Sequence, residues 1–119
     1  MNSRGTGAKG VEISIEMIKG RGKRKHYKVS IAGALTIYEA ANAKTALLEA
    51  LQASAELEID LSRVTEVDTA GMQLLLMTKR EAARAERKVR LAHSAASLEA
   101  LDRYNLGAYF GDPVVISPQ

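Results

Sequence analysis

The chain is 119 residues long, and 46% of its residues are hydrophobic and 26% charged. This size and balance are typical of one soluble globular domain with a core of its own. The absence of cysteine excludes disulfide bonds, thiolate metal ligands and cysteine nucleophiles. No apolar segment resembles a signal peptide or is long enough to span a bilayer, so we expect a cytoplasmic protein without membrane insertion.

The basic residues are concentrated near the N-terminus. Residues 1–28 contain eight Lys or Arg and two Glu, and most of these cations lie between Lys19 and Lys28. One interpretation of this basic segment is a phosphate or nucleic-acid contact. The other is a solvated hairpin loop, which we favour because the segment has two glycines and Tyr27 as its single aromatic residue. We therefore expect no nucleic-acid partner.

The first predicted elements form a β-hairpin. Residues 1–9 are rich in Gly, Ser and Asn, which predicts a disordered leader before a domain that spans residues 10–119. Apolar and polar residues alternate from Val11 to Met17 and again from His26 to Leu35, a pattern typical of half-buried strands. The basic segment between them predicts a rather long turn.

A helix and a third strand follow the hairpin. Thr36 can cap a helix, and the sequence after it is rich in good helix formers, which predicts a helix from about Ile37 to Ala53. Leu57 to Leu61 alternates again and predicts a short strand. Val64 and Val67 then fall in an extended link.

The next predicted helix begins at a polar pair. Asp68 or Thr69 can serve as its N-cap, and the helix is expected to run to about Glu86. Residues Val89 to Ala92 alternate apolar and polar side chains, which predicts another strand.

The C-terminal part contains one more helix and strand. Ser94 or Ser97 can cap a short helix that ends near Tyr104, with residues 105–107 as its stop and residues 113–116 as a final strand. Single strands alternating with helices require crossover connections, which join parallel strands. The predicted fold class is therefore α/β: a single mixed β-sheet of about five strands, with an N-terminal hairpin, a largely parallel remainder and helices packed against it.

The residue types that carry catalysis are sparse. His26 and His93 are expected in loops, and neither a nucleophile elbow nor metal-ligand spacing accompanies them. Asp60, Asp68 and Asp112 fall at strand ends or in loops, in no pattern that indicates a metal site. We infer that the protein is not an enzyme and needs neither a cofactor nor a metal.

The most informative segment runs from Leu57 to Leu76. A strand ends, a short loop crosses, and a helix begins at Thr69, where backbone amides and the helix dipole favour a negative group. A phosphate on Thr69 would be stabilised there and would add about −2 of charge to the surface. From the residues alone, the alternative is that Thr69 only caps the helix.

Two short motifs in this segment carry a family resemblance. Residues 59–62 are Ile-Asp-Leu-Ser and residues 68–71 are Asp-Thr-Ala-Gly. Together with the element order and the later sequence Tyr104-Asn105-Leu106, they resemble the signature of STAS domains, which occur in sulfate transporters and anti-sigma factor antagonists. The resemblance covers roughly Val11 to Ser117 and implies the STAS fold.

The resemblance also implies a role in regulation. In anti-sigma factor antagonists an ATP-binding partner kinase phosphorylates the residue that corresponds to Thr69, although here Thr replaces the usual Ser and Ala70 replaces a second hydroxyl residue. The implied partner is an anti-sigma factor Ser/Thr kinase, or a protein of a histidine-kinase system of the chemotaxis type. STAS proteins also accompany such histidine-kinase systems, and this chain resembles those STAS proteins in Gly71-Met72-Gln73-Leu74-Leu75. The alternative is the ATPase of a phospholipid ABC transporter, whose STAS subunit has a similar Asp-Thr-Ala-Gly motif.

The helix after Thr69 has two candidate faces. Helical spacing predicts a sheet-facing side made of Gly71, Leu74, Leu75, Thr78, Ala82 and Ala85. Met72, Gln73 and Leu76 share the other side with Thr69 and are candidates for partner contact, or else Met72 and Leu76 are buried as well. The predicted partner-binding set is Asp68, Thr69, Ala70, Gly71, Met72, Gln73 and Leu76, with Thr69 as the phosphorylation site.

Overall fold

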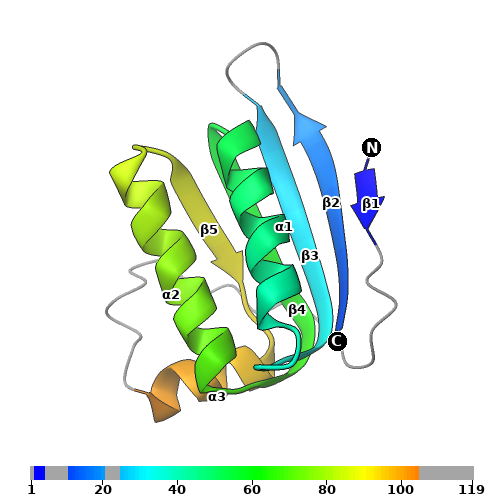
Figure 1. Cartoon of the computed structure of the whole chain (residues 1–119), viewed down its shortest axis with the longest axis vertical. Helices are drawn as coiled ribbons and strands as arrows, with labels where there is room; N and C mark the ends of the chain where they lie inside the picture. The colour runs from blue at the N-terminus through cyan, green and yellow to red at the C-terminus, as the bar shows by residue number, and fades with distance from the viewer. Residues whose placement is uncertain (1, 5–10, 21–24, 105–119) are drawn as a thin grey trace.

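The computed structural model describes residues 2–4, 11–20 and 25–104. Five strands form one sheet in the order β1-β2-β3-β4-β5, antiparallel from β1 to β3 and parallel from β3 to β5 (Figure 1). The predicted mixed α/β sheet is therefore confirmed. The elements are β1 (Asn2–Arg4), β2 (Val11–Lys19), β3 (His26–Leu35), α1 (Ala40–Ala53), β4 (Glu56–Val67), α2 (Thr69–Arg84), β5 (Lys88–Ala92) and α3 (Ala95–Arg103).

Strand β1 differs from the expected disordered leader. It pairs with the outer edge of β2, with Asn2 opposite Ile15 and Arg4 opposite Ile13. The edge of β2 offers unpaired backbone groups, which even a three-residue segment can bind. The predicted strand at residues 113–116 and the predicted stop at residues 105–107 lie outside the described residues.

The two faces of the sheet differ in polarity. Helices α1 and α2 lie side by side on one face (Figure 1), where alternate residues of the strands are buried. The opposite face carries polar side chains, including an ion pair in which Lys28 Nζ lies 3.5 Å from a carboxylate oxygen of Asp60. The side chains that are almost fully buried include Ile13, Ile31, Leu35, Leu47, Leu57, Ile59, Leu61, Met72 and Leu75.

Helix α1 begins three residues later than predicted. Residues 37–39 form a turn in which the Glu39 amide donates to the Thr36 carbonyl over 3.0 Å, so Thr36 is not the cap. Instead, the Ile37 amide donates to the side chain of Asp68. The loop between β3 and α1 is therefore fastened to a distant residue rather than wound into the helix, whose predicted end at Ala53 is confirmed.

Strand β4 is longer than the predicted strand from Leu57 to Leu61 and includes the segment expected to be a link. Its pairing with β3 shifts register twice, between Ser30 and Ala32 and between Gly33 and Ala34. Each bulge inserts one extra residue, so the buried residues Leu61, Val64 and Val67 are three apart instead of two. A strict two-residue alternation therefore cannot detect this half of the strand.

Helix α2 ends at Arg84, two residues before the predicted end. Glu86 has a φ of 56°, and the Arg87 amide donates to the Ala82 carbonyl over 2.8 Å. A left-handed residue followed by this bond is a common way to terminate a helix. No residue type marks this helix end, because the left-handed position is occupied by Glu rather than Gly.

Candidate functional site

Asp68 is the residue that organises the start of α2. One of its carboxylate oxygens, Oδ1, accepts a hydrogen bond from the Gly71 amide over 2.9 Å. The other, Oδ2, accepts one from the Ile37 amide, also over 2.9 Å. A single carboxylate thus caps α2 and holds the β3–α1 loop against it.

Gly71 allows the first turn of α2 to lie directly on the end of β3. A Cβ at this position would lie 2.3 Å from the Leu35 carbonyl oxygen, which no side chain tolerates. The Asp68 amide also donates to that oxygen, over 3.3 Å. The place of Gly71 in the motif therefore follows from packing, and Gly71 is buried.

Thr69 is the first residue of α2, and its side chain is exposed. Its hydroxyl does not cap the helix, since Asp68 does. The Thr69 Oγ1 atom lies 2.9 Å from the Tyr104 hydroxyl, and Tyr104 is the half-buried residue that follows α3. Thr69 is therefore accessible at a helix N-terminus, where backbone amides and the helix dipole favour a negative group.

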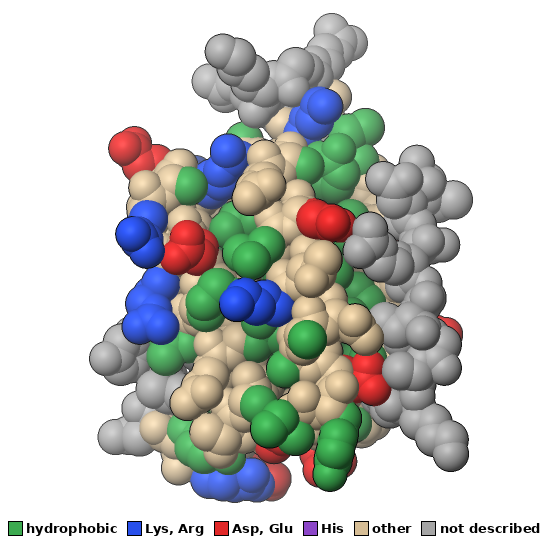
Figure 2. Space-filling view, in the orientation of Figure 1, with side chains coloured by type: hydrophobic (Ala, Val, Ile, Leu, Met, Phe, Trp, Pro, Cys, Tyr) green, Lys and Arg blue, Asp and Glu red, His purple; other side chains and the backbone are tan. Residues whose placement is uncertain are grey.

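Two large apolar side chains stand exposed in the loop that Asp68 holds. Ile37 is 66% exposed and Tyr38 is 89% exposed. Figure 2 shows hydrophobic side chains at the lower end of the molecule, where α1 and α2 begin. Sequence reasoning missed these residues because Ile37 and Tyr38 were assigned to a helix. We refer to Ile37, Tyr38, Thr69 and Gln73 as the docking surface.

The remaining residues of the predicted partner-binding set are divided between core and surface. Gln73 is exposed, whereas Ala70 and Leu76 are half-buried. Met72 is only 2% exposed, so of the two alternatives for this residue, partner contact or burial, burial holds. Of the predicted sheet-facing residues, Ala85 is exposed because α2 has already ended.

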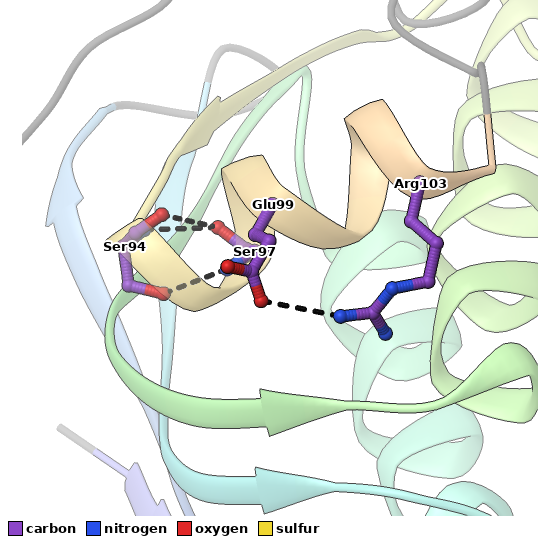
Figure 3. Close-up of polar contacts among 4 residues, drawn as sticks. All are labelled: Ser94, Ser97, Glu99 and Arg103. Carbon is purple, nitrogen blue, oxygen red and sulfur yellow. Dashed lines mark hydrogen bonds and ion pairs between the residues drawn. The ribbon is translucent and has the colours of Figure 1, made fainter.

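The start of α3 uses its hydroxyl groups for structure. Ser94 caps the helix by accepting from the Ser97 amide over 3.1 Å, and the Ser97 hydroxyl accepts from the Ser94 amide over 2.9 Å (Figure 3). His93, expected in a loop, is buried, and its Nδ1 atom lies 3.0 Å from the Ser97 hydroxyl oxygen. His26, also expected in a loop, is the first residue of β3. The hydrogen bond of His93 therefore connects it to a residue of the α3 cap.

Asp60, the aspartate of the first motif, lies on the polar face of the sheet. Its Oδ1 atom accepts from the Ser62 amide over 2.9 Å, at the first bulge of β4. Burial raises the pKa of Asp60, but hydrogen bonds from Ser62 and the nearby Lys28 ammonium outweigh it and hold the pKa below its usual value of 3.8. We assign Asp60 a structural role. Within the described ranges, no group of three or more His, Asp or Glu side chains is placed to hold a metal ion.

Comparison with known proteins identifies the family. Residues 19–114 match the family described as "Mlab, STAS domain", so the chain belongs to the STAS domain family. No curated protein sequence matches the chain. In the part of the chain that the structure describes, no helix is long and apolar enough to span a bilayer.

Solved structures of low sequence identity share the fold. An anti-sigma factor antagonist from Mycobacterium paratuberculosis matches with a TM-score of 0.72 and 16% identity, covering 90% of this chain and 86% of that one. The anti-sigma factor antagonist SpoIIAA in its unphosphorylated form gives 0.68 and 14%, with 90% and 89% covered. The phosphorylated form of the Bacillus cell fate determinant SpoIIAA gives 0.66 and 16%, with 90% and 92% covered.

Proposed function

We propose that this STAS domain is a cytoplasmic regulator of the anti-sigma factor antagonist kind, which binds a partner protein through the docking surface and is released by phosphorylation of Thr69. The observation that carries the proposal is an exposed hydroxyl at the start of α2, together with two exposed apolar side chains, Ile37 and Tyr38, in the loop that Asp68 fastens to that helix start. Large exposed apolar side chains beside polar groups are typical of interaction sites, and tyrosine is frequent among residues that dominate binding energy.

The modification is an ordinary phosphoryl transfer. The partner kinase supplies ATP, and the Thr69 Oγ1 oxygen attacks the γ-phosphorus as the bond to ADP breaks. The hydroxyl proton passes to a base on the kinase, and ADP leaves. Because Thr69 is exposed and Asp68 already caps α2, the oxygen can react without loss of the helix cap.

Phosphorylation then weakens the bound state through desolvation. A phosphate brings about −2 of charge to Thr69, and on the proposed docking surface this charge is buried in the same interface as Ile37 and Tyr38. Burying an unpaired charge in an interface costs on the order of 2–5 kcal/mol, and ~4 kcal/mol is about a thousandfold in affinity. One modification is thus sufficient to release the partner.

Affinity capture with three baits tests this proposal. Wild type, Thr69→Glu and Thr45→Glu are immobilised and exposed to extracts of the source cells, and bound proteins are identified by mass spectrometry. Thr45 is a matched control because it is also exposed, but lies in the second turn of α1. We expect a protein with a kinase fold on wild type and Thr45→Glu and its loss from Thr69→Glu; equal capture by all three baits contradicts the switch.

A second candidate function is favoured by the family match itself. The matching family is described as "Mlab, STAS domain", and Asp68 to Gly71 resembles the motif of the STAS subunit of a phospholipid ABC transporter. In that case the same docking surface binds an ABC ATPase. The capture experiment separates the two candidates, because the partner is then an ABC ATPase and not a Ser/Thr or histidine kinase.

A further inference from the structure

The hydroxyl of Thr69 is joined to a part of the chain that the motif does not include. Its Oγ1 atom lies 2.9 Å from the Tyr104 hydroxyl, across 35 residues of sequence. Tyr104 also ends α3, where its amide donates to the Ala100 carbonyl over 3.1 Å. One residue therefore contacts the candidate phosphorylation site through its side chain and the last turn of α3 through its backbone.

We propose that Tyr104 is a positioning residue that fixes the Thr69 side chain and transmits its chemical state to the end of α3. The regulatory meaning of this contact rests on the proposed function, but the contact itself is measurable without any partner. While Thr69 carries a free hydroxyl, either oxygen can donate in the bond between them, so Thr69 is held in one rotamer. Phosphate replaces that hydroxyl with acceptor oxygens only, so the Tyr104 hydroxyl must then donate to a bulkier group.

The change at Thr69 alters the end of α3 because Tyr104 has little freedom to follow it independently. Its ring is half-buried and packs against the hydrophobic core, and its amide lies in the last hydrogen-bonded turn of α3. Moving the ring outward to accommodate phosphate therefore strains that turn. The end of α3 is thus a second region in which the modified and unmodified forms differ, distinct from the docking surface.

Nuclear magnetic resonance on the isolated protein tests the proposal. The ring ¹³Cζ shift of Tyr104 and the hydrogen exchange of its amide are compared in wild type, Thr69→Ser, Thr69→Val and Thr69→Glu. We expect Thr69→Ser to retain the wild-type shift, whereas Thr69→Val and Thr69→Glu both move it. Exchange in Thr69→Val should accelerate about twofold, the low end of the range expected for losing one hydrogen bond, because Thr69 is exposed.

Two further variants separate coupling from general loosening. Thr45→Val removes a hydroxyl that donates only to Ala41 within α1, so the Tyr104 signals should not change. Tyr104→Phe should accelerate exchange at residue 104 as much as Thr69→Val, and the double variant should add nothing more. Additive effects, or an unchanged Tyr104 shift in Thr69→Val, overturn the proposal. A failed proposed function would instead leave these signals intact and appear only as equal partner capture.

Discussion

Helices α2 and α3 begin with similar polar residues that have opposite surroundings. At α3, the hydroxyl of each of Ser94 and Ser97 accepts a hydrogen bond from the backbone amide of the other serine, and both side chains are buried (Figure 3). At α2, the carboxylate of Asp68 makes the capping bond, and the hydroxyl of Thr69 remains on the surface. A hydroxyl residue at a helix start is therefore available for modification when a neighbouring residue is the cap.

The difference also concerns what each helix start holds in place. The α3 cap holds a buried histidine through Ser97. The α2 cap holds an exposed loop, because Asp68 accepts from the Ile37 amide. One start therefore stabilises the interior, and the other presents a surface.

The largest effect is expected from Gly71→Ala, which prevents the seating of α2. The new Cβ would lie 2.3 Å from the Leu35 carbonyl oxygen, a backbone atom that cannot turn aside. Overpacking of this kind costs about 1–3 kcal/mol, and we expect the upper end of that range in urea denaturation. An unchanged unfolding midpoint would show that α2 is not packed on β3 as described.

A smaller loss is expected from Ser97→Ala at the buried cap of α3. The substitution leaves the Ser94 amide without its acceptor and removes one hydrogen-bond partner of His93. Leaving a buried polar group unsatisfied costs about 1–3 kcal/mol, measurable by thermal or urea unfolding. If Ser97→Ala reduces the free energy of unfolding by no more than Thr69→Val does, the starts of α2 and α3 do not differ in the way described.

The Asp68→Ala variant should reduce stability by about 1 kcal/mol, the usual contribution of an N-cap. It should also release the β3–α1 loop, because the Ile37 amide loses its acceptor. Faster hydrogen exchange at Ile37 in this variant, with unchanged exchange in the middle of α1, is the expected signature. Protection of Ile37 equal to wild type would mean that Asp68 does not hold the loop.

Asp60, which takes part in neither helix start, should make the stability of the protein depend on pH. Because its pKa in the folded protein is lowered, its stabilisation is present above its unfolded pKa and is lost as the pH falls through the lower folded value. Asp60→Asn should therefore lose less stability than wild type between about pH 5 and pH 2. Identical acid unfolding curves for wild type and Asp60→Asn would contradict the lowered pKa of Asp60.

The smallest effect on stability is expected from Thr69→Val. Asp68 supplies the cap and Thr69 is exposed, so the free energy of unfolding should change by no more than about 0.5 kcal/mol. Circular dichroism during urea unfolding measures this value. A loss above about 1 kcal/mol, as expected from a true cap, would assign Thr69 a structural role.

Sequence patterns were sufficient for the order of elements from β2 to α3, but not for β1 or for the phase of every face. Alternation identified β2, β3 and the first half of β4, and the polar residues before α2 and α3 located their starts. The bulges after Asp60 cannot be predicted from the sequence, because the spacing of buried residues in β4 changes only through the way β4 pairs with β3. Met72 could not be assigned to the core or the surface, because a shift of one residue rotates a helix face by about 100°.

The surface around Thr69 was only partly predictable. The motif located Thr69 and Gln73, since both follow directly from the start and period of α2. Ile37 and Tyr38 could not be found, because their exposure depends on a hydrogen bond between residues 31 positions apart. Tyr104 was likewise expected near the end of α3, but its contact with Thr69 depends on how α3 packs against β4.

Release of the partner by phosphorylation of Thr69 can be measured by comparing the affinity of the captured partner for unmodified protein and for protein carrying phosphothreonine at position 69. Isothermal titration calorimetry measures both dissociation constants under the same conditions. We expect the phosphorylated form to bind at least about thirtyfold more weakly, which corresponds to ~2 kcal/mol. Equal dissociation constants for the two forms would contradict this expectation.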